Sequence, residues 1–137
     1  MDIDFLDAHD RHWRDAEQLF ASTRLANADH LYGMAAECGL KHLMSAFGMP
    51  VTNDGDPTRQ ADRKHADNVW ARYETYRSGQ LQGASFTLPA SNPFIGWNIS
   101  QRYASQSRFD QNRVERHRDG AETVHDLIKK ARKDGLI

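Results

Sequence analysis

Apolar residues recur at three- and four-residue steps along most of this chain, and that spacing constrains its fold more than any other feature. The spacing places apolar side chains on one face of an α-helix, and it occurs over about residues 4–23, 27–47, 58–77 and 110–133. No stretch alternates apolar and polar residues as a half-buried strand would, and no internal repeat is present. The pattern therefore predicts an all-α protein, a compact four- to five-helix up-and-down bundle.

Two connections between the predicted helices differ in composition. Residues 51–58 are dense in turn formers, which predicts a loop. Between Gly83 and Arg108 the chain contains two prolines and many Ser and Asn residues, yet also large apolar residues, among them Phe86, Phe94, Ile95, Trp97, Ile99 and Tyr103. A connection of this length is unusual in a compact domain unless it packs or binds something. We therefore expect one long packed loop before the last helix.

The second predicted helix contains two interior glycines, Gly33 and Gly39. Each costs about 1 kcal/mol relative to alanine in a helix. Close packing of another helix at these two points would compensate for that cost, and we expect it there.

The composition is that of a single globular domain covering residues 1–137, with 39% hydrophobic and 27% charged residues. Cys38 is the only cysteine, so no intramolecular disulfide can form, and its apolar surroundings predict a packed small side chain. Four of the first ten residues are Asp, which does not fit a secretory signal, and no apolar run approaches roughly 20 residues. We expect a cytoplasmic protein that does not enter a membrane.

The net charge of −1 hides an uneven distribution along the chain. Residues 1–57 carry ten acidic and four basic residues, whereas residues 58–137 have an excess of five basic ones. Such a division predicts either an acidic surface that attracts a basic protein or two ordinary solvated helix faces. If the acidic surface exists, its candidate partner-binding residues are Asp7, Asp10, Asp15, Glu17 and Asp29.

Seven histidines raise the question of a metal site. No pair has the HExxH spacing, no CxxC is present, and the closely spaced pairs lack a suitably spaced third ligand. The chain also lacks a glycine-rich phosphate loop. The sequence therefore predicts neither a metal nor another cofactor.

Glu37 and Lys41 lie four residues apart, so they share one face of the second predicted helix and can form an ion pair. If this stretch is partly buried, the pair needs further partners, for which Arg102 or a histidine is suitable. The pair either stabilises the bundle internally or belongs to a functional site. In the second case a nucleotide or other small ligand would bind in a polar pocket formed by Glu37, Lys41, His65 and Arg102.

Arginine and histidine side chains on one surface can cleave RNA, because Arg binds phosphate and His transfers protons near neutral pH. On the last predicted helix, Arg113 and His117 are four residues apart and Arg118 and His125 are seven apart, so each pair shares a face. Arg102, at the end of the long loop, is a further candidate. Each of these pairs could equally be solvated surface.

Five segments together resemble a known family and cover nearly the whole chain. They are HWRDAEQLF at 12–20, ANADHLYGMAAECGLKHLM at 26–44, KHADNVW at 64–70, WNISQRYA at 97–104 and the closing amphipathic helix that ends in ARKDGLI. These segments are similar to HEPN domains, small helical bundles of prokaryotic toxin–antitoxin and other conflict systems. The most specific likeness is in the second predicted helix, around Glu37 and Lys41.

The HEPN resemblance implies an up-and-down helical bundle, often dimeric. It implies that some members are metal-independent ribonucleases, with an Arg separated from a His by roughly four to six residues, and that others are binding modules without catalysis. Here Arg113 and His117 are separated by only three residues, and Arg118 and His125 lie late in the last predicted helix. These departures favour binding.

Two principal hypotheses follow from the sequence. The first is a non-catalytic HEPN-like protein of the immunity or antitoxin type, which binds and neutralises a basic toxin. The alternative is a HEPN-type ribonuclease toxin that acts on RNA, with catalytic candidates Arg102, His117, Arg118 and His125. Neither hypothesis requires a cofactor, and homodimerisation is compatible with both.

Overall fold

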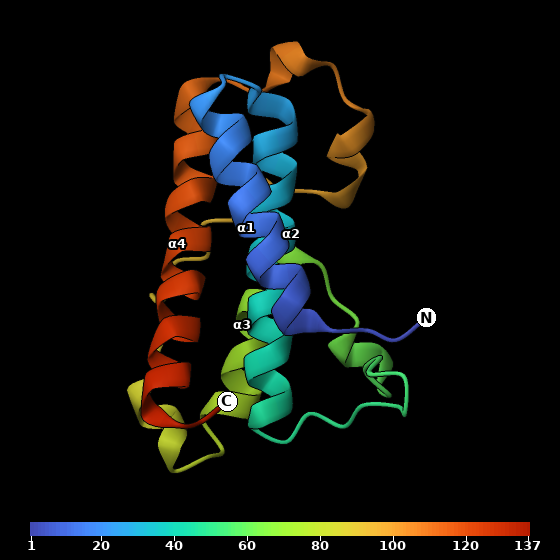
Figure 1. The fold of residues 1–137 in the computed structure, drawn as a ribbon, viewed down its shortest axis with the longest axis vertical. Coiled ribbons are helices and arrows are strands. Elements are labelled where there is room, and N and C mark those ends of the chain that lie inside the picture. Colours follow the sequence, from blue (N-terminus) through green and yellow to red (C-terminus); the bar gives the residue numbers. More distant parts are fainter.

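A computed structural model describes all residues, 1–137, and shows an all-α helical bundle (Figure 1). Its four α-helices and four short 3-10 helices are α1 (Phe5–Ala21), α2 (Leu25–Ala46), η1 (Gln60–Asp62), α3 (Ala66–Arg77), η2 (Gln82–Ser85), η3 (Ile99–Tyr103), η4 (Gln106–Arg108) and α4 (Gln111–Asp134). No strand is present, and the only bridge pairs Val51 with Pro57. None of the helices combines the length and apolar character needed to cross a membrane.

Helix α2 lies at the centre of the bundle and contacts α1, α3 and α4. Glu17 of α1 meets Tyr32 near the start of α2, so α1 runs antiparallel to α2. His65 lies beside Glu37, whereas Tyr73 packs on Phe47, so α3 runs parallel to α2. Helix α4 is also parallel to α2 (Figure 1). The order of the helices therefore differs from a simple up-and-down arrangement. The connection 47–65 returns the chain to the middle of α2, and the connection 78–110 returns it to the start of α2.

The ends of three helices lie within two residues of their predicted positions. Asp4 caps α1 by accepting a hydrogen bond from the Asp7 backbone N at 2.9 Å, and Asp110 caps α4 in the same way. Gly135 ends α4 in the left-handed conformation, with φ of 77°. Helix α3 starts later than predicted, at Ala66, because the preceding segment turns so that the buried Asp62 accepts hydrogen bonds from α3.

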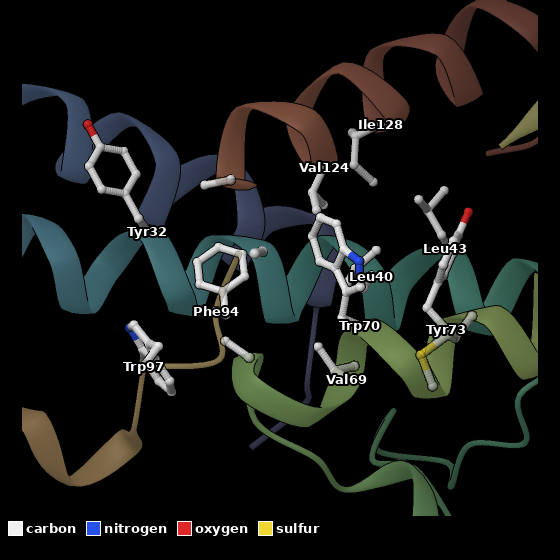
Figure 2. Close-up of a cluster of buried hydrophobic side chains, with 14 of the residues drawn as sticks. Tyr32, Leu40, Leu43, Val69, Trp70, Tyr73, Phe94, Trp97, Val124 and Ile128 are labelled. Atoms are coloured by element: carbon white, nitrogen blue, oxygen red, sulfur yellow. The ribbon is translucent and has the colours of Figure 1, made fainter. Parts of the chain in front are cut away.

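Much of the long connection before α4 packs against the bundle, as predicted. Phe86, Phe94, Trp97 and Phe109 are buried within one continuous hydrophobic cluster. Phe94 packs against Gly120 of α4 and Trp97 against Gly33 of α2, and Figure 2 shows both aromatic side chains within the buried cluster. Ile95 and Tyr103 are exceptions, since more than three quarters of each is exposed.

The two interior glycines of α2 are points of close approach. A Cβ atom at Gly33 would overlap the indole ring of Trp97, and one at Gly39 would press on Val124 and His9. The expected packing of helices occurs at Gly39, between α1 and α4. At Gly33 the neighbour is the long connection rather than a helix.

Candidate functional site

A fully buried carboxylate, Asp29 of α2, joins three parts of the bundle. Its Oδ1 lies 2.6 Å from Nδ1 of His117 on α4. Its Oδ2 accepts hydrogen bonds from Nε2 of Gln101 at 2.6 Å and from Nε of Arg113 at 3.3 Å. These partners compensate for the loss of water around the carboxylate. Asp29 therefore has to be removed from the predicted acidic partner face, because it is not accessible.

The predicted catalytic pair of Arg102 and His117 is not brought together. His117 is fully buried between Asp29 and the ring of Phe94, whose centroid is 5.3 Å away, and its Nε2 has no partner. Arg102 is exposed, with its guanidinium 5.0 Å from the ring centroid of Tyr103. Asp29 instead links His117 to Arg113, so the pair of Arg113 and His117 has a structural role. Because His117 is buried, it cannot reach an external substrate.

The outer side of this network opens into two adjoining hollows that contain four arginines. The larger has a volume of about 470 Å³ and is lined by Gly96, Gln101, Ala104, Ser105, Arg108, Phe109 and Arg113. The smaller has a volume of about 190 Å³ and is lined by Arg24, Ala26, Asn27, Gln101, Arg102, Ala104 and Gln106. We call the two together the arginine pocket. No Asp or Glu lines either hollow, so the pocket is suited to a carboxylate or phosphate.

One arginine of this pocket is held firmly in position. Arg113 donates from Nη2 to the Gly96 carbonyl and to Gln101 Oε1, both at 2.9 Å. Together with its contact to Asp29, these bonds fix the guanidinium at the pocket wall. Arg24, Arg102 and Arg108 are exposed and form no hydrogen bond or ion pair through their side chains. Their donors are therefore available to a ligand.

The predicted ion pair between Glu37 and Lys41 exists and is almost fully buried. Lys41 Nζ lies 2.7 Å from Glu37 Oε1, and His65 Nδ1 lies 3.2 Å from Oε2. Of the two partners considered from the sequence, the histidine is the one present. Arg102 lines the smaller hollow of the arginine pocket instead. The predicted four-residue polar pocket is therefore reduced to a three-residue cluster.

Arg118 and His125 are each engaged with α1. Arg118 forms two hydrogen bonds with the Glu17 carboxylate, at 2.7 and 3.0 Å, and Tyr32 donates to the same carboxylate at 2.6 Å. The Arg118 hydrogen bonds lower the pKa of Glu17. The His125 ring stacks on Trp13, with centroids 4.7 Å apart. Both side chains remain partly exposed, but their contacts hold α4 against α1.

Helix pairing explains part of the uneven charge distribution, because three of the ten acidic residues in 1–57 pair with bases of α4. Asp10 pairs with Arg132 at 2.6 Å, Glu17 with Arg118, and Asp29 with Arg113, so the acidic amino-terminal half binds the basic last helix. Of the predicted acidic face, Asp7 and Asp15 remain exposed, and they share the helix surface with the exposed Arg11 and Arg14.

The structure also brings together a group that the sequence analysis did not identify. His9 and Asp10 of α1 lie beside His125 of α4, with a possible ligand atom of each within 4.8 Å of the others. No spacing rule could reveal this group, because His9 and Asp10 are adjacent on α1 whereas His125 lies 116 residues after His9, on α4.

Comparisons with models of protein families, with curated proteins and with solved structures find no match to this chain.

Proposed function

We propose that this protein is a non-catalytic, HEPN-like binding module of the immunity or antitoxin type, which neutralises a partner toxin by covering it. The observation that carries the proposal is the arginine pocket, where four arginines border two hollows without an acidic residue in the lining. The helical bundle is compatible with the HEPN resemblance. Most of the predicted catalytic side chains are bonded to other side chains within the fold, which favours binding over chemistry.

The arginine pocket also indicates the chemistry of the partner. A basic toxin would need a free acidic surface, but Asp10, Glu17 and Asp29 are paired internally. Exposed arginines beside the exposed Tyr103 instead favour an acidic segment of the toxin, because Arg and Tyr are common at the centres of protein interfaces. We therefore propose an acidic segment as the bound element.

Charge reversal tests this proposal. The protein would be coexpressed with the product of the adjacent reading frame, and growth rescue and complex formation would be measured. We expect Arg102→Glu with Arg108→Glu to weaken the complex at least about tenfold, because like charges then face each other. Arg116→Glu is the matched control, since Arg116 is exposed on α4 outside the arginine pocket. Absence of both rescue and complex would refute the function.

The alternative, a metal-independent ribonuclease that acts on RNA, is favoured by one observation. Arg118 and His125 share a face of α4 and are both partly exposed. This hypothesis predicts that the protein expressed alone slows growth, and that His125→Ala relieves the effect. Harmless overexpression would exclude it.

A further inference from the structure

The group formed by His9, Asp10 and His125 lies at the seam between α1 and α4, away from the arginine pocket. His9 Nε2 is 3.0 Å from His125 Nδ1. A carboxylate oxygen of Asp10 lies within 4.8 Å of a ring nitrogen of each histidine. His9 is fully buried, whereas the other two are partly exposed. The site is thus open to solvent on one side.

Each of the three side chains is oriented by a neighbour. His9 Nδ1 lies 2.8 Å from the Ala35 carbonyl and donates to it, which leaves a lone pair on Nε2. Trp13 stacks on His125 with an interplanar angle of 16°. Arg132 binds Asp10 through Oδ2, so Oδ1 is left for another partner. Metal-binding histidines and carboxylates are commonly held in this way by a carbonyl or a second side chain.

The distances suit a small transition-metal ion. Two nitrogens that bind Zn²⁺ tetrahedrally at about 2.0–2.1 Å are separated by about 3.3 Å. The present separation of 3.0 Å requires only a small movement of either ring. Burial lowers the pKa of His9 to about 4 and also lowers that of His125, so both rings are neutral at pH 7. Binding then needs only a shift of the His125 proton from Nδ1 to Nε2.

We propose that His9, Asp10 and His125 form a binding site for a divalent transition-metal ion such as Zn²⁺, with water in the fourth position. The ion replaces the hydrogen bond between the two histidines. Because the ligands come from α1 and α4, the bound ion also links the first and last helices of the bundle and stabilises the folded state. This site is independent of the proposed partner-binding function.

Titration of the full-length protein with Zn²⁺, after removal of metals with EDTA, tests the proposal. Calorimetry is expected to show one ion per chain, and the melting temperature is expected to rise by about 10 °C at a hundredfold excess over Kd. Substitution with Co²⁺ should give the absorption bands of a tetrahedral site with nitrogen ligands.

Variants separate this site from adventitious binding by surface histidines. His125→Ala should abolish binding, and Asp10→Asn should weaken it at least about tenfold while replacing the carboxylate with a group of the same shape. His12→Ala is the matched control, because His12 lies on α1 outside the group and should leave binding unchanged. Binding that survives in His125→Ala and Asp10→Asn, or none in the unmodified protein, overturns the proposal and leaves the histidine pair as a structural hydrogen bond.

Discussion

Asp29 shows how one residue can determine the arrangement of several elements. Its carboxylate accepts from His117, Arg113 and Gln101, and Trp97 donates to its backbone carbonyl at 3.1 Å. The opposite charge comes from Arg113, which also forms part of the arginine pocket wall. A residue that the charge pattern assigned to a surface is therefore the internal support of the candidate site.

Replacing Asp29 with alanine is expected to destabilise the protein by about 3 kcal/mol. The substitution leaves the buried His117 without its acceptor and the Arg113 guanidinium without its countercharge, which is costlier than the loss of an exposed pair. Unfolding in urea measures the change. Asp15→Ala, on the exposed side of α1, is the control and should change stability by no more than about 0.5 kcal/mol. Equal stability of the two variants would contradict the role of Asp29.

The candidate residues could be selected from the sequence by type, but their partners could not. Asp29 and His117 are 88 residues apart, and no periodic pattern relates them. The pair Glu37 and Lys41 was predictable because four residues on one helix fix their geometry. Where two helices had to meet, as for Arg118 and Glu17, the sequence offered only residues of opposite charge.

At the level of elements, α2 is the helix against which the others pack. Gly39 allows α1 and α4 to approach it closely, and Gly33 does the same for Trp97 of the long connection. The three-to-four-residue spacing predicted the extent of α1, α2 and α4. Helices α1 and α4 each have one apolar and one polar side, whereas α2 is surrounded by the other helices and is buried on most of its surface. The same spacing misplaced the start of α3, because the buried Asp62 is held by Arg72 and Tyr76 and diverts the chain. Tertiary hydrogen bonds of this kind override local preference.

Gly33→Ala is expected to destabilise the protein by about 1–3 kcal/mol. Alanine favours a helix by about 1 kcal/mol, but its methyl group would overlap the Trp97 indole, which is held by the hydrogen bond to α2. Chemical unfolding measures the difference. Gly79→Ala is the control. Apart from its chain neighbours, the nearest atom to the added carbon would be the Tyr76 carbonyl oxygen at 3.8 Å, and the backbone of Gly79 is not in the left-handed conformation that favours glycine. A Gly33→Ala protein as stable as the control would show that Trp97 can move aside without cost.

On the scale of the whole molecule, three ion pairs connect the acidic first part of the chain to the last helix. The ion pairs Asp10 to Arg132, Glu17 to Arg118 and Asp29 to Arg113 are distributed along the length of α4. What remains unpaired on the outside includes the arginines beside the long connection. Part of the charge division in the sequence therefore reflects the ion pairs that hold α4 against α1 and α2. The charged side chains that these pairs leave unpaired form the surface available to a partner.

Stability of the whole molecule is expected to fall as the pH decreases from about 6.5 towards 4. Burial lowers the pKa of five histidines, His9, His12, His30, His42 and His125, and that of His9 falls to about 4. In this range the unfolded chain binds protons that the folded chain excludes, so protonation favours unfolding. His9 alone accounts for a loss of about 2 kcal/mol between pH 7 and pH 5. The lowered pKa of Glu17 acts only at lower pH, because its ordinary value is 4.5.

Urea unfolding at pH 7 and pH 5, in the presence of EDTA, measures this loss. His9→Gln removes the largest contributor to this pH dependence. Between pH 7 and pH 5 the free energy of unfolding of the variant should therefore fall by about 2 kcal/mol less than that of the unmodified protein. For each protein, the free energy of unfolding at pH 5 is subtracted from its own value at pH 7. Any destabilisation by the substitution that is the same at both pH values therefore cancels. An equal fall in the two proteins would mean that folding does not lower the pKa of His9. A larger fall in the variant than in the unmodified protein would mean that the pKa of His9 is raised and that its ring is protonated in the folded bundle. Its hydrogen bond to the Ala35 carbonyl would then stabilise a charged ring, and the site at the α1–α4 seam would repel a metal ion instead of binding it.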